Sequence, residues 1–79
     1  MTKLEQKLLE LGYERTTYFD ITEVIWWKGS IAIATDKRGL KIKRANVQVG
    51  YVNKQQDIDN LQQAFNILQQ DLEVLKEYA

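Results

Sequence analysis

Residues 31–44 read IAIATDKRGLKIKR, two alternating runs separated by the turn sequence Asp36-Lys37-Arg38-Gly39. Apolar residues that alternate with small or charged ones have the period of a β-strand, and a turn closed by glycine at positive φ is typical of a short hairpin. The segment therefore predicts two antiparallel strands. The core face is expected to carry Ile31, Ile33, Leu40 and Ile42, and the opposite face Ala32, Ala34, Lys41 and Lys43.

The alternating pattern continues on both sides of this hairpin, and Lys28-Gly29 is a second turn signal. We expect strands at residues 22–27, 30–35 and 40–44, with further strands at 14–19 and 47–52. Hairpin connections make such a sheet antiparallel. Because Trp26 and Trp27 are neighbours on one predicted strand, they lie on opposite faces and only one of them joins the core.

Two amphipathic helices are predicted to flank the strands. Thr2 and Glu5 have the spacing of a capping box at the start of a helix over residues 3–11. After Val52, an unbroken 3-4-3-4-3 spacing predicts a helix over about residues 54–78 with one apolar seam. The seam comprises Ile58, Leu61, Phe65, Leu68, Leu72 and Leu75.

These elements predict a single small α+β domain over residues 1–79. It has a short N-terminal helix, an antiparallel sheet of three to five strands, and a long C-terminal helix packed on the sheet. At 1.5 Å per residue the long helix would measure about 37 Å, whereas a compact globule of this size is about 30 Å across. We therefore expect the helix to overhang its own domain.

The overhang suggests an interface with a protein partner or a second copy of the chain. We expect it on the distal part of the helix, where a second apolar stripe lies beside the seam, and the candidate interface residues are Leu72, Leu75, Tyr78, Ile67 and Val74. The alternative is a helix that is folded wholly onto the sheet and the first helix.

The composition restricts the chemistry that the chain can perform. Its 79 residues include 11 basic and 11 acidic side chains but no Cys, His or Pro, so the usual nucleophiles, bases and soft metal ligands are missing. Glu14, Asp20 and Glu23 are candidate catalytic carboxylates, although solvated strand ends explain them more simply. We predict a non-enzymatic protein that uses no cofactor or metal and has no evident small-molecule ligand.

The small size of the chain also favours association. A core of this size supplies only about 3–5 kcal/mol, and a chain without Cys or His lacks disulfides and the usual zinc sites. Self-association is the remaining way to bury more surface. With no signal-peptide pattern and no apolar run long enough for a membrane span, we expect a cytoplasmic protein that makes no membrane contact.

The charges are segregated along the chain. Residues 28–44 contain six basic side chains and one acidic one, a net charge of +5, whereas residues 55–79 contain one basic and five acidic ones, a net charge of −4. A basic hairpin near tryptophans is typical of a nucleic-acid surface. This alternative function would use Lys28, Lys37, Arg38, Lys41, Lys43 and Arg44. Lysines on an outer strand also serve simply to prevent edge aggregation.

The two ends of the chain carry a further pattern, KLEQKLLELGY at residues 3–13 and QDIDNL and LKEY at residues 56–61 and 75–78. These ends resemble those of small uncharacterised proteins encoded by prophages of Gram-positive bacteria. The resemblance covers the two helices and brings no catalytic or binding residues with it. It implies a phage accessory protein that acts in the cytoplasm of the host.

Overall fold

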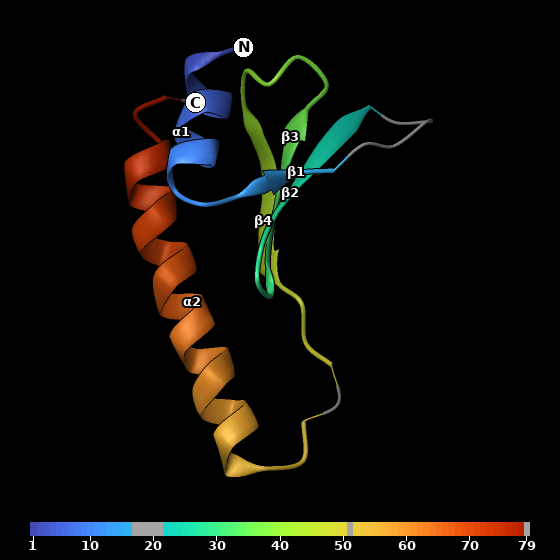
Figure 1. Cartoon of the computed structure of the whole chain (residues 1–79), viewed down its shortest axis with the longest axis vertical. Helices are drawn as coiled ribbons and strands as arrows, with labels where there is room; N and C mark the ends of the chain where they lie inside the picture. Colours follow the sequence, from blue (N-terminus) through green and yellow to red (C-terminus); the bar gives the residue numbers. More distant parts are fainter. Residues whose placement is uncertain (17–21, 51, 79) are drawn as a thin grey trace.

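The computed structural model describes residues 1–16, 22–50 and 52–78 and has an α+β fold (Figure 1). The elements in chain order are α1 (Lys3–Glu10), β1 (Glu14–Arg15), β2 (Glu23–Lys28), β3 (Ile31–Asp36), β4 (Ile42–Val47) and α2 (Gln55–Leu75). Within the described residues, four strands form one antiparallel sheet in the order β1-β2-β3-β4. The predicted fold class is therefore confirmed.

Both helices lie on one side of the sheet, and the hydrophobic core fills the space between them and the strands (Figure 1). Trp26 points into this core and is fully buried, and its indole Nε1 donates a hydrogen bond to Thr35 Oγ1 at 3.1 Å. Trp27 is half-buried on the opposite face, as its position beside Trp26 predicts. The buried residues of this core cluster are Leu4, Leu8, Tyr13, Val24, Trp26, Ile31, Ile33, Val47, Ala64, Leu68 and Leu75.

The capping box at the start of α1 is confirmed. The Glu5 N–H donates to Thr2 Oγ1 at 3.1 Å, and the Thr2 N–H donates to Glu5 Oε1 at 2.8 Å. Gly12, at φ +97°, ends the helix in the left-handed conformation that a glycine favours. The Thr2 hydroxyl also donates to the Gly39 carbonyl at 2.7 Å, so the cap fastens α1 to the turn between β3 and β4.

The predicted strand boundaries are wrong on the C-terminal side of the sheet. Among the described residues, a single strand, β4, is present where two were expected at 40–44 and 47–52, and position 51 lies outside the described residues. Leu40 is not in the core but 50% exposed in the turn. The Leu40 N–H donates to the Asp36 carboxylate, which places Leu40 in the turn. β4 also contains a bulge: Ala34 pairs with Arg44 but Thr35 pairs with Ile42, which leaves Lys43 as the extra residue. Residues 17–19 of the strand predicted at 14–19 lie outside the described residues.

The predicted overhang of the long helix is confirmed, but at the other end. α2 has 21 residues, about 31 Å, and its N-terminal turns extend past the sheet (Figure 1). Its C-terminal turns pack against α1 and the sheet, and Leu75 is fully buried. The overhang makes the molecule elongated, with extents of 40 × 28 × 17 Å.

Candidate functional site

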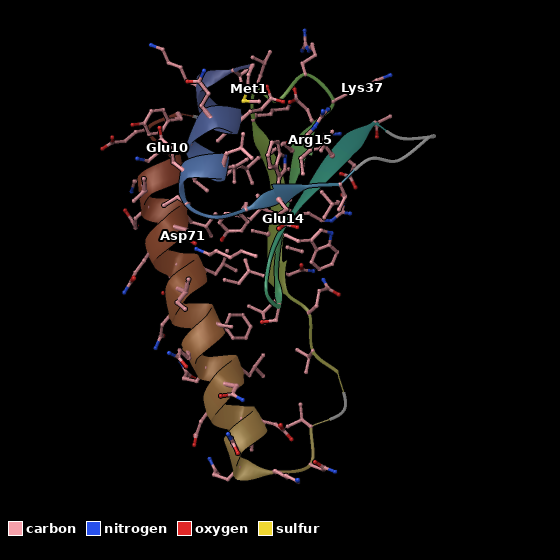
Figure 2. All side chains as sticks on the ribbon, in the orientation of Figure 1. Met1, Glu10, Glu14, Arg15, Lys37 and Asp71 are labelled. Atoms are coloured by element: carbon pink, nitrogen blue, oxygen red, sulfur yellow. The ribbon has the colours of Figure 1, made fainter. Side chains whose placement is uncertain are left out.

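A buried polar cluster joins α1, the sheet and α2. Asp71 Oδ2 accepts hydrogen bonds from the Tyr13 hydroxyl and from Lys28 Nζ, each at 2.7 Å. Lys28 Nζ also donates to the Leu11 carbonyl at 3.1 Å and lies 4.7 Å from the centroid of the Tyr13 ring. We call Tyr13, Lys28 and Asp71 the polar triad; Figure 2 labels Asp71 on α2.

The polar triad has a structural role, because it connects Tyr13 and Lys28 to Asp71 on α2. Burial, followed by the hydrogen bond and negative charge of Asp71, raises the pKa of the Tyr13 hydroxyl far above its ordinary value. That phenol stays protonated and keeps donating to Asp71. Sequence reasoning missed the triad, although Asp71 carries a signal: it lies three residues after Leu68 and four before Leu75, in the buried stripe of α2.

The six cations proposed for nucleic acid do not form one surface. Lys28 belongs to the polar triad, which corrects its assignment as a free contact residue. Arg44 Nη1 lies 2.6 Å from Glu23 Oε1 in an ion pair across the sheet. The other four are exposed around the β3–β4 turn and form no ion pair with another described residue; we call Lys37, Arg38, Lys41 and Lys43 the basic turn.

The basic turn is held in shape by Asp36. Its Oδ1 accepts the backbone N–H of Leu40 at 2.6 Å and that of Lys41 at 3.4 Å, while the Gly39 N–H donates to the Asp36 carbonyl at 3.0 Å. The hydrogen bond from Leu40 is the main reason that the pKa of Asp36 lies below its usual value. The carboxylate is therefore ionised at neutral pH and fixes the turn.

The face of the sheet turned away from both helices holds a shallow cavity of about 250 Å³. We call this surface the open face, and it is lined by Ile25, Trp27, Ala32, Ala34, Arg44, Asn46 and Gln48. The register sets Trp27, Ala32 and Asn46 in one row across β2, β3 and β4. β3, the middle strand, contributes only Ala32 and Ala34 to the cavity, so their small side chains form its floor. Trp27 on β2 lies on one side of this floor, and polar side chains of β4 begin on the other.

The candidate carboxylates are not brought together. Glu14 on β1 pairs with Trp27 on β2. Glu23 lies four residues before Trp27 on the same strand, so the two carboxylates are separated by about 13 Å along the sheet. Glu23 is already paired with Arg44, and Asp20 lies outside the described residues. Within the ranges that the structure describes, no three acidic side chains gather as a metal site would require. The geometry of Glu14 and Glu23 offers no acid–base pair.

The predicted partner residues on α2 divide into two groups. Leu75 is fully buried, and Ile67 and Leu72 are half-buried against the core, so these three are committed within the domain. Val74 and Tyr78 are each 38% exposed. The expectation that the C-terminal turns are uncovered is wrong, because α1 packs on this end of α2 and its Lys7 lies 5.9 Å from the Tyr78 ring centroid.

The largest exposed apolar side chains near the overhang occur on the N-terminal half of α2 and the loop before it. Val49 is 54% exposed, Ile58 49%, Phe65 42% and Val52 40%; we call these four the apolar patch. A cavity of about 180 Å³ between loop and helix is lined by Val49, Val52 and Leu61, among others. Ile58 and Phe65 belong to the predicted seam, so the sequence identified the residues but not which end of the seam is left uncovered.

Neither helix in the described part of the chain combines the length and the apolar character that crossing a membrane requires. No protein-family model matches this chain, and neither a curated protein nor a solved structure is significantly similar to it.

Proposed function

We propose that this protein is a non-enzymatic interaction module that binds a second copy of itself through the apolar patch. The observation that carries the proposal is the exposure of four large apolar side chains on the N-terminal half of α2 and the loop before it. Apolar side chains gathered in this way usually mark an interaction site. Pairing would cover them and add to a core that is small for a stable fold.

The charge around the apolar patch favours a second copy as the partner. In a two-fold symmetric interface each surface meets itself, so every charge near the axis faces a like charge. Residues 48–70 contain only Lys54, Asp57 and Asp59 as charged residues. The flanking glutamines and asparagines both donate and accept hydrogen bonds, and they can therefore pair with their own kind.

The available area agrees with a modest interface. A standard interface buries about 800 Å² on each partner, which is about one-seventh of the 5643 Å² of accessible surface here. Four side chains alone do not reach that area, but the overhanging helix face and the loop over residues 48–50 lie beside them. We expect a dimer of micromolar affinity whose dissociation constant changes little with salt, because few charges take part.

The test is sedimentation equilibrium of the full chain over a wide concentration range. Ile58→Glu with Phe65→Glu should keep the protein monomeric, since the interface would bury unpaired carboxylates. Gln62→Glu with Gln70→Glu adds the same charge to exposed positions on the outer side of α2 and should leave the dimer intact. A wild type that stays monomeric at millimolar concentration, or a control pair that dissociates equally, would overturn the proposal.

The prophage context suggested by the resemblance of the chain ends remains part of this proposal. The resemblance implies a phage accessory protein of unknown activity, and we propose that it acts by binding.

A further inference from the structure

A second surface is present at the other end of the molecule, away from the apolar patch. Figure 2 labels Lys37 on the β3–β4 turn, at the opposite end of the long axis from the start of α2. Four cations lie within seven residues here without an ion pair to any described residue. Such a group repels itself, and the Asp36 carboxylate, which interacts with Arg38 and Lys41, offsets part of that repulsion.

The basic turn is preorganised. Asp36 fixes its backbone with two N–H hydrogen bonds, and Thr2 at the cap of α1 holds its Gly39 carbonyl. A Cβ atom at Gly39 would lie only 2.5 Å from Glu5 Cδ, so the turn is packed directly against the helix. A turn fixed in this way can present its cations to a ligand with little further loss of conformational entropy.

The open face continues from the basic turn along β4. Lys43 is the bulge residue, the next residue Arg44 projects onto the open face, and Asn46 and Gln48 follow it. Arg44 extends across β3 to reach Glu23 on β2. The Arg44 guanidinium and the Trp27 ring therefore lie on the same surface and line the same cavity.

These groups together fit one ligand chemistry. Exposed lysine and arginine bind phosphates, tryptophan and guanidinium stack on bases, and amide side chains can pair with base edges. Bases inside a duplex are already stacked on their neighbours, so a stacking surface selects unpaired ones. We propose that single-stranded nucleic acid binds along β4, with its phosphates on the basic turn and a base on Trp27 in the open face.

Fluorescence titration of the full chain with oligothymidine at low salt tests the proposal. Stacking should quench Trp27, whereas Trp26 is fully buried and should not respond. The logarithm of the binding constant should fall with the logarithm of salt concentration with a slope of about −3, as expected for four phosphate contacts on a single strand. A duplex of the same length should bind at least tenfold more weakly and without quenching.

Variants separate the two parts of the surface. Replacing all four residues of the basic turn by Gln should lower the affinity at least tenfold and bring the salt slope close to zero. Trp27→Leu should cost about tenfold and leave the slope unchanged, while Trp27→Phe should restore part of the loss. Lys54→Gln with Lys76→Gln removes two exposed cations elsewhere and should change neither quantity.

Two results would overturn the proposal. One is the absence of salt-dependent binding at micromolar protein. The other is equal binding of duplex and single strand with Trp27→Leu unchanged, because the open face would then take no part. The monomeric variant that combines Ile58→Glu with Phe65→Glu should still bind oligothymidine, so failure of the dimer and failure of this site are distinguishable.

Discussion

Lys28 Nζ donates to Asp71 Oδ2 at 2.7 Å, and this contact links a strand to a helix 43 residues further along the chain. The Asp71 side chain is 10% exposed and that of Lys28 28%. Such a contact is half-buried, so the attraction is stronger than in water while desolvation is incomplete. Because Tyr13 donates to the same oxygen, the polar triad fixes how α2 lies on the sheet.

The first prediction concerns this pair. Asp71→Leu removes the acceptor of both Tyr13 and Lys28 and should lower the free energy of unfolding by about 2–3 kcal/mol. Lys28→Met combined with Asp71→Leu should cost less than the sum of the single changes, with a coupling of about 1 kcal/mol or more. Urea unfolding of the four proteins in the double-mutant cycle measures this. Strict additivity would show that the contact contributes nothing.

The second prediction concerns Tyr13 at alkaline pH. Its pKa is raised in the folded state, mainly by burial, so the folded chain keeps a proton that the unfolded chain loses near pH 10. The stabilisation is therefore complete below about pH 10 and falls as the pH rises further. Absorbance titration should show one of the four tyrosines ionising only on unfolding.

A matched variant isolates that effect. Tyr13→Phe should lower the free energy of unfolding at neutral pH, because one buried hydrogen bond is lost. It should also lose stability less steeply than the wild type between about pH 9 and 11, because no proton at position 13 is involved. Parallel slopes for the two proteins would contradict a protonated, hydrogen-bonded Tyr13.

The third prediction contrasts two seam residues of α2. Leu68 is 4% exposed, and Leu68→Ala should lower the free energy of unfolding by about 2–5 kcal/mol, as should Ile33→Ala in the sheet. Ile58 is 49% exposed, and Ile58→Ala should change the free energy of unfolding by less than about 0.5 kcal/mol when the protein is monomeric. Chemical denaturation at low protein concentration measures all three. Equal costs at positions 58 and 68 would contradict an uncovered overhang.

Local sequence signals predicted the parts of the fold that depend on neighbouring residues. The capping box at Thr2 and Glu5 and the turn closed by Gly39 need only a few adjacent positions, and both are present. Helical spacing also predicted α2, to within three residues at its C-terminal end. The bulge at Lys43 was not predictable in this way, because pairing between β3 and β4 decides it. Leu40 was misplaced because its N–H donates to the Asp36 carboxylate within the turn.

The site residues were harder to predict because charge does not reveal its partner. The sequence predicted Lys28 to be a surface cation, whereas in the folded chain it is paired with Asp71. The apolar seam on α2 gave no information on where the sheet ends, so the uncovered part was assigned to Leu75 rather than to Phe65. The partner of Lys28 and the uncovered part of α2 both depend on contacts between residues far apart in the sequence, which residue periodicity does not reveal.

The packing of α1 against the end of α2 has a consequence for anything joined to this chain. The Thr2 hydroxyl is hydrogen-bonded to the Gly39 carbonyl, and Tyr78 lies beside Lys7. Both ends of the chain therefore lie at the same pole, meaning the same end of the long axis, as the basic turn (Figure 1). A tag or neighbouring domain attached at either end would project from that pole. It would leave the overhang of α2 clear at the far pole, whereas an insertion into the loop over residues 48–50 would obstruct it.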